Sequence, residues 1–174
     1  MFLTQGNSVC WDPDLEMLAE FLAVVDGQLE IILRGLTNAA EAYEGYFDFD
    51  SAEHITGLGF VACQTYLTAT YGFLNLKKLD ALSAGPHHSS GQTIVQIINH
   101  AANFWKHHDE WHLDKSKAQQ ERVRYAFATI GFPVDLDYPL GGILADLAAP
   151  EPAAFKPLVA RLEQWREELR GAVT

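Results

Sequence analysis

The chain is poor in cysteine and in basic residues, and each shortage excludes a class of protein. Only two of the 174 residues are cysteines, Cys10 and Cys63, so a disulfide-stapled secreted fold is excluded and reduced thiols are favoured. Lys and Arg number 12 against 23 Asp and Glu, which gives a net charge of −11. Because affinity for phosphate backbones comes mostly from clustered Lys and Arg, this balance argues against general coating of nucleic acid.

Long apolar runs are also missing. No uninterrupted apolar stretch approaches the roughly 20 residues that a membrane-spanning helix needs, and the first residues do not resemble a secretory signal. We therefore expect a cytoplasmic protein that does not enter a membrane. The length and the 48% apolar content are sufficient for one domain with a substantial core, so residues 1–174 are expected to form a single helical domain.

The negative charge is unevenly distributed along the chain. Residues 1–76 carry eleven acids and one base, whereas residues 77–124 carry seven bases and five acids. The same middle segment holds six of the seven histidines. The middle of the chain is therefore the only part in which the charge permits a local RNA-binding site.

Apolar residues recur at alternating steps of three and four, the spacing of amphipathic helices. Asp12 and Pro13 form a typical helix start, and residues 44–50 have the composition of a turn. The predicted helices cover about 13–43, 51–76, 93–112, 116–130, 142–148 and from near 152 to the C-terminal region. No strand alternation is visible, so the sequence predicts an all-α antiparallel helical bundle of about five to six helices.

Three glycines lie inside the second predicted helix: Gly57, Gly59 and Gly72. Each costs about 1 kcal/mol relative to alanine in a helix interior. We expect them to permit the close approach of neighbouring elements.

The third predicted helix, which Thr93 is expected to cap, concentrates the histidines on two sides. One side is apolar and belongs to the core: Ile94, Ile98, Ala101, Trp105, His108 and His112. The opposite side carries Gln96, His100, Asn103, His107 and Glu110. Imidazoles and an amide together suit acid–base or phosphate chemistry, and they also suit a hydrogen-bonded contact between two copies.

His108 and His112 are four residues apart, a separation that lets two imidazoles bind one metal ion. Aspartate stands at position 109, where zinc proteases have glutamate, and His54 is the best candidate for a third ligand. Three-histidine sites of this kind occur in DinB-like four-helix bundles. The alternative, which we favour, is that His108 and His112 are core-edge groups bonded to carbonyls, with no metal and no cofactor.

The stretch Asn103-Phe104-Trp105-Lys106-His107 resembles the HEPN superfamily, whose motif is an arginine, four to six residues, and a histidine. The resemblance implies a HEPN-like helical bundle, often dimeric, found in prokaryotic toxin–antitoxin and anti-phage defence systems, where many members cut RNA. Asn103 matches the polar position after the arginine, and His107 matches the histidine. The arginine itself is replaced by Ala102, and lysine does not reproduce its planar fork.

Two main hypotheses follow. In the first, the protein is a metal-independent endoribonuclease in which His107 is the general acid or base and Asn103 orients the phosphate. His100 or Lys106 would supply positive charge, and two copies would complete the site. In the second, the protein is a non-catalytic module whose polar face binds its own second copy or a protein encoded by a neighbouring gene.

Overall fold

The computed structural model describes residues 11–38, 42–111 and 118–173, and its regular elements are helical. No β-strand occurs in these ranges, where the only extended pairing is an isolated bridge between His87 and Thr93. The expected all-α bundle is thus confirmed. The elements are α1 (Pro13–Asn38), α2 (Ala42–Phe73), α3 (Lys78–Leu82), α4 (Ile94–His107), the 3₁₀ turn η1 (His108–Glu110), α5 (Ala118–Thr129), α6 (Pro139–Ala148) and α7 (Lys156–Val173).

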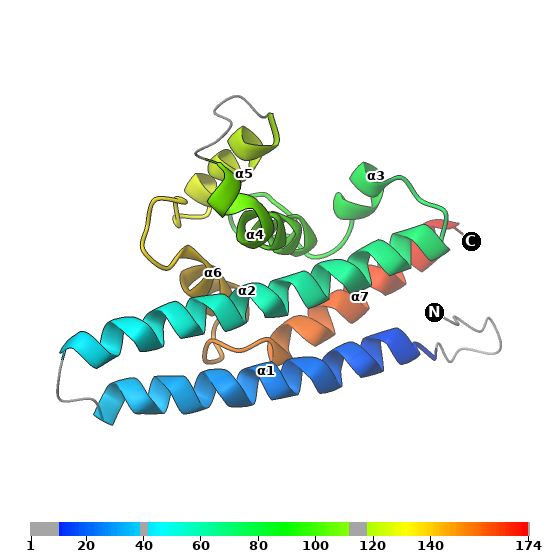
Figure 1. Cartoon of the computed structure of the whole chain (residues 1–174). Coiled ribbons are helices and arrows are strands. Elements are labelled where there is room, and N and C mark those ends of the chain that lie inside the picture. Colours follow the sequence, from blue (N-terminus) through cyan, green and yellow to red (C-terminus); the bar gives the residue numbers. More distant parts are fainter. Residues whose placement is uncertain (1–10, 39–41, 112–117, 174) are drawn as a thin grey trace.

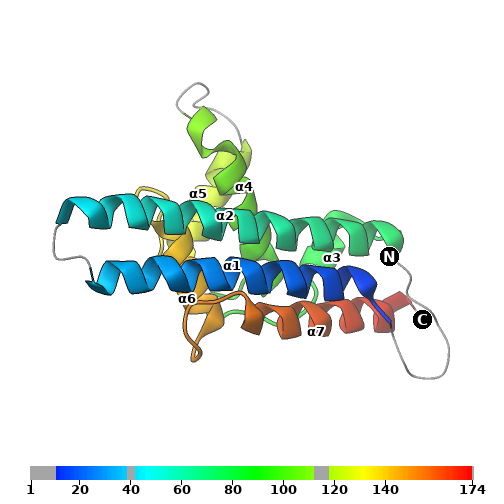
Figure 2. The ribbon, with the colours of Figure 1, turned by 60° about the horizontal axis from the view of Figure 1, so that its bottom comes forward.

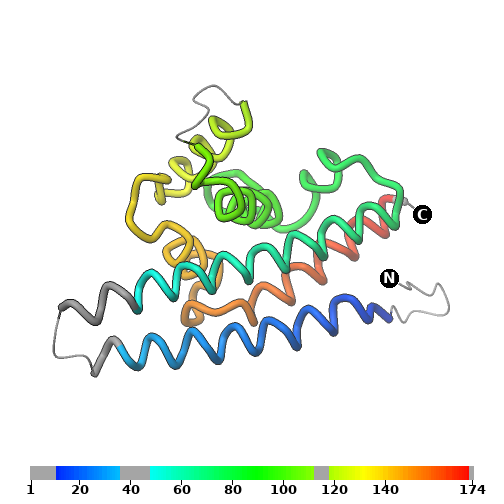
Figure 3. Tube along the Cα trace, in the orientation of Figure 1, coloured from blue at the N-terminus to red at the C-terminus, as the bar shows by residue number. Residues whose placement is uncertain are grey.

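Two long antiparallel helices, α1 and α2, form the base of the molecule (Figure 1). Helix α7 runs alongside α1 (Figure 2) and also contacts α2, where the ring centroids of Tyr66 and Trp165 lie 6.3 Å apart. Helix α4 is viewed nearly along its axis in Figure 1, so it crosses over α2, with α3 and α5 on either side. The Cα trace in Figure 3 shows the same arrangement. Because α4 is surrounded, most of its residues are buried.

The first helix begins as its sequence predicts. Pro13 is its first residue, and the carboxylate of Asp12 accepts a hydrogen bond of 3.1 Å from the amide of Leu15. The residues at steps of three and four from Leu15 are buried: Leu15, Leu18, Leu22, Val25, Leu29 and Ile32. The expected end near residue 43 is wrong, because Ala42 and Tyr43 belong to α2.

The predicted turn at 44–50 is wrong, because α2 begins at Ala42 and runs through that segment. Its glycine and acidic residues favour a turn in isolation. In the folded chain this part of α2 pairs with α1, and the ring of Phe49 stacks on Tyr138 with a centroid distance of 5.4 Å. Tertiary packing therefore outweighs the local preference.

Two of the three glycines of α2 do permit a close approach, of aromatic rings from other elements. A Cβ atom at Gly57 would lie 1.7 Å from Cδ1 of Trp105, and one at Gly59 would lie 2.4 Å from the ring of Phe155. A Cβ atom at Gly72 would meet nothing within 4 Å. The expectation is confirmed for Gly57 and Gly59 and wrong for Gly72.

The capping role of Thr93 is confirmed. Its hydroxyl accepts a hydrogen bond from the amide of Gln96 at 3.2 Å, and the Gln96 side chain accepts one from the amide of Thr93 at 3.0 Å. The α-helix that follows ends at His107 rather than near His112, and η1 continues it to Glu110. The short helix α3 is not visible in the apolar spacing of the sequence.

Buried acids connect distant elements. Asp12 accepts hydrogen bonds from Arg166 at 2.9 Å and from Tyr66 at 2.7 Å, which joins the start of α1 to α7 and α2. Burial alone would raise the pKa of Asp12, but these donors hold it below its usual value. Glu53 of α2 accepts hydrogen bonds from the first amides of α6, those of Leu140 and Gly141.

Candidate functional site

Three polar residues of α4 meet a single side chain of α2, Gln64, which is only 8% exposed. Its Nε2 donates to Oδ1 of Asn99 and to Oδ1 of Asn103, both at 3.0 Å. Its Oε1 accepts a hydrogen bond of 2.6 Å from Nζ of Lys106. Asn103 and Lys106, both predicted as catalytic, are therefore held against α2 by one shared partner.

Lys106 is a partly desolvated cation that is hydrogen-bonded to Gln64. Burial lowers the pKa of its ammonium, and the nearby positive charge of Lys78 lowers it further. Its hydrogen bond to Gln64 satisfies one N–H donor of this partly desolvated ammonium. The structure thus assigns Lys106 a contact across the α2–α4 interface.

His100 lies between α4 and the basic side chains of α3 and α5. Its Nδ1 is buried without a hydrogen-bond partner among the described residues. Burial lowers the pKa of His100 to about 4, and the positive charges of Lys78 and Arg122 act in the same direction. Burial therefore favours the neutral form of this imidazole, and the role of His100 as a source of positive charge stays a prediction.

His107 is exposed, as is the neighbouring Lys106, and 47% of the His107 side chain is accessible to solvent. Its Nδ1 lies 3.6 Å from a carboxylate oxygen of Glu110. His107 and Asn103 line the same small pocket of about 220 Å³, together with Glu110, Trp111, Gln119, Gln120 and Val123. Of the four predicted catalytic residues, the structure brings only Asn103 and His107 to one pocket.

Ala102, at the position of the motif arginine, is fully buried. An arginine here would place a guanidinium in the core, at a large desolvation cost. The packing of α4 therefore fits the alanine that stands at the position of the motif arginine.

The alternative metal ligands are not gathered into a site in the part of the chain that is described. His108 directs Nδ1 toward the carbonyls of Phe104 and Trp105, at 3.2 and 3.1 Å, as the core-edge interpretation predicts. The exposed His54 packs edge-on against the indole of Trp105. His112 lies outside the described residues. No cluster of three or more His, Cys, Asp or Glu side chains suited to a metal occurs among the residues described.

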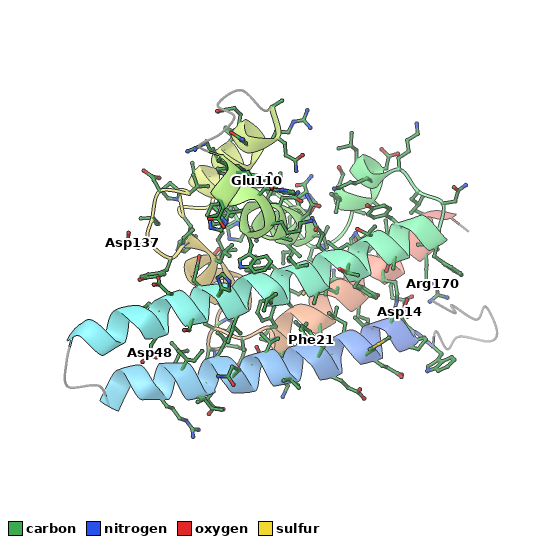
Figure 4. The ribbon with its side chains drawn as sticks, in the orientation of Figure 1. Asp14, Phe21, Asp48, Glu110, Asp137 and Arg170 are labelled. Atoms are coloured by element: carbon green, nitrogen blue, oxygen red, sulfur yellow. The ribbon has the colours of Figure 1, made fainter. Side chains whose placement is uncertain are left out.

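An exposed apolar surface, which the sequence interpretation missed, covers the outer side of the α1–α2 hairpin. We call it the hairpin face, and it consists of Met17, Phe21, Val24 and Ile31 of α1 with Leu58, Ala62, Thr65, Ala69 and Phe73 of α2. Its large members are between 44% and 71% exposed. Phe21 is labelled on α1 in Figure 4.

The hairpin face contains a shallow groove. About 540 Å³ of space lies between the two helices over Met17, Leu18 and Phe21 on one wall and Ala62, Thr65, Tyr66 and Ala69 on the other, with Asp14 at one end. Two sequence signals mark this surface. Met17, Phe21, Val24 and Ile31 form a second apolar stripe on α1, and no Asp, Glu, Lys or Arg occurs between residues 55 and 76.

Comparisons with protein-family models, with curated proteins and with solved structures each gave no match. Among the described helices, none has the length and apolarity needed to cross a membrane.

Proposed function

We propose that the protein is a non-catalytic helical interaction module that forms a homodimer through the hairpin face. The observation that carries this proposal is the exposure of Met17, Phe21, Val24 and Ile31 beside the uncharged outer side of α2. Contiguous apolar surface of this kind marks a contact site in soluble proteins.

The distribution of charge favours a second copy as the occupant. Two chains of net charge −11 repel each other, and the repulsion is smallest where the contact surfaces carry no charge. Residues 55–76 provide such a surface along most of α2. A two-fold contact would place this segment against itself, and it requires only that the surface be self-complementary.

The hairpin face is long enough for two helices to pack along it. From Met17 to Ile31 it follows about 21 Å of α1, at 1.5 Å per residue. Leu58 to Phe73 of α2 extends over a similar length. Small residues at Ala62 and Ala69 leave room for the large side chains of the other copy.

The experiment is a measurement of molecular mass in solution by sedimentation velocity. We expect the mass of two chains for the unmodified protein and the mass of one chain for Phe21→Glu combined with Leu58→Glu. Each substitution places a charge in the centre of the contact, where it would be desolvated without a partner. Leu79→Glu is the matched control, because Leu79 is 76% exposed on α3, and it should leave the dimer intact.

A monomeric unmodified protein would sink the dimer proposal. Dimers that persist in the double variant but disappear when the α4 face is changed would move the interface to Asn103 and His107. Circular dichroism of the double variant should match that of the unmodified protein, which excludes unfolding as the cause of dissociation.

A HEPN-like ribonuclease of a defence or toxin–antitoxin system is the second candidate function. The observation in its favour is that His107 is half exposed beside Glu110 in the pocket that Asn103 also lines. The test is cleavage of a mixed single-stranded RNA library by the unmodified protein and by His107→Ala. Cleavage that requires His107 would establish this function, and equal background in both would remove it.

A further inference from the structure

A second open groove lies on the other flank of α1, between α1 and α7. It encloses about 1080 Å³ and is separate from the hairpin face, which lies on the α2 side of the same helix (Figure 2). We call it the α1–α7 groove. Its apolar walls come mainly from Ala19, Ala23, Gly27 and Leu33 on α1 and from Ala153, Ala154, Val159 and Ala160 before and within α7.

The shape of the α1–α7 groove suits a helix. Ala19, Ala23 and Gly27 are spaced four residues apart and form one line along α1. A Cβ atom at Gly27 would meet nothing within 4 Å, so this wall is open rather than filled by a neighbour. From Ala19 to Arg34 the groove follows about 22 Å of α1, the length of roughly four helical turns.

The charges around the α1–α7 groove favour a basic occupant. Helix α1 carries five acids, Asp14, Glu16, Glu20, Asp26 and Glu30, against one base, Arg34. Glu16 and Glu20 are exposed and lie, by helical spacing, at the edge of the groove wall. Glu163 of α7 lines the groove from the other side, and the lining carries two cations, Arg34 and Lys156.

Asp26 is already used within the fold. Its carboxylate accepts hydrogen bonds from the amides of Phe155 and Lys156, at 2.7 and 3.0 Å, and so caps the start of α7. Glu30 pairs with Arg34 on the surface of α1. Glu163 is paired with Arg166 of the same helix at 3.3 Å, so the acids that can meet an incoming cation are Glu16 and Glu20, on the α1 side of the groove.

We propose that the α1–α7 groove binds an amphipathic helix of another protein, with small apolar side chains on its inner face and Lys or Arg on its flanks. Helix-in-groove recognition of this kind uses apolar anchors at steps of three and four. Flanking cations would add charge complementarity that speeds encounter and excludes acidic helices. This inference extends the proposed role as an interaction module, but it uses a different face and does not require dimerisation.

The test uses two synthetic peptides of about 18 residues, or five turns, with the same Leu and Ala face. One carries Lys on its flanks and the other carries Glu. Binding is followed by fluorescence anisotropy with the full-length protein. We expect the Lys peptide to bind, and the Glu peptide to bind about tenfold more weakly or not at all.

Variants that fill the groove provide the decisive comparison. Gly27→Leu and Ala23→Leu should weaken binding of the Lys peptide by about tenfold or more, because each places a side chain in the space of the helix. Gly27→Leu replaces a glycine inside a helix, so it should not destabilise the fold. Ala128→Leu, at an exposed alanine of α5, is the matched control and should bind like the unmodified protein.

Three outcomes would overturn the inference: no binding of the Lys peptide, equal binding by the groove variants, or loss of self-association in Ala23→Leu. The last would assign the groove to a second copy. Peptide binding in the double variant Phe21→Glu and Leu58→Glu separates the two proposals. Retained binding by a monomer supports the groove alone, and a dimer without peptide binding supports the hairpin face alone.

Discussion

Gln64 of α2 and Asn103 of α4 are joined by a hydrogen bond of 3.0 Å across a largely buried interface. This contact changes the interpretation of Asn103, which the sequence places on the side of its helix opposite the apolar core. A buried amide satisfied by another amide contributes to the fit between two helices. Asn103 is therefore part of the packing between α2 and α4, whereas Lys106 and His107 are exposed.

We predict that Gln64→Ala will lower the free energy of unfolding by about 1–3 kcal/mol, because it removes the shared partner of Asn99, Asn103 and Lys106. Urea denaturation followed by circular dichroism measures the change. Gln164→Ala is the matched control, since Gln164 is exposed on α7 and bonds only to the neighbouring Glu168. Equal stability of the two variants would contradict a structural role for the Gln64 contacts.

Arg166 carries a second buried polar link, and we predict that Arg166→Met will be more damaging than any surface change. Its side chain is 3% exposed and so is that of Asp12, which it contacts at 2.9 Å. Removing one partner of a buried ion pair costs about 3–5 kcal/mol, because the other charge stays buried without compensation. The melting temperature should fall clearly, whereas Arg170→Met, one turn further along α7 and more exposed, should change it little. A small effect of Arg166→Met would show that Tyr66 alone satisfies Asp12.

Most of the fold follows from local patterns in the sequence. The steps of three and four predict the buried side of α1, and the cap at Thr93 predicts the start of α4. Both patterns depend on neighbours within a few residues. The prediction of a turn at 44–50 is wrong because the helical state of this segment depends on contacts with α1 and Tyr138. Such contacts are not visible in local composition.

The candidate site was predicted less well, for a geometric reason. Periodicity places Asn103 and Lys106 away from the apolar stripe of α4, but it does not reveal that a second helix with Gln64 covers that side. For the hairpin face the difference is the reverse: the sequence interpretation did not predict an exposed apolar surface. The apolar steps of α1 identify its buried side, but they do not reveal that Phe21 belongs to a second apolar side, which the fold leaves exposed.

The contact between Gly57 and Trp105 leads to a third prediction. A Cβ atom at position 57 would lie 1.7 Å from the indole, which is a rigid ring rather than the end of a flexible chain. Gly57→Ala should therefore destabilise the protein by about 1–3 kcal/mol, despite the better helix propensity of alanine. Gly72→Ala, in the same helix with open space around it, should stabilise the fold by up to about 1 kcal/mol. Thermal unfolding of the pair tests this, and the same sign of change in both would contradict the packing argument.

The last prediction concerns acid sensitivity and His100. Burial, with Lys78 and Arg122 nearby, lowers the pKa of His100 to about 4 in the folded state, against 6.5 for an ordinary histidine. Between these values the unfolded chain binds a proton that the folded chain excludes, so the stability must fall as the pH falls through this window. The loss approaches about 1.4 kcal/mol per pH unit for this group and stops below the folded pKa. His100→Gln removes the titrating group, and its free energy of unfolding should decline less than that of the unmodified protein between about pH 7 and pH 5. The comparison is made by urea denaturation at both pH values, with His54→Gln as a control for the loss of an exposed imidazole. An unchanged pH dependence in His100→Gln would mean that His100 is protonated in the folded protein and has solvent access.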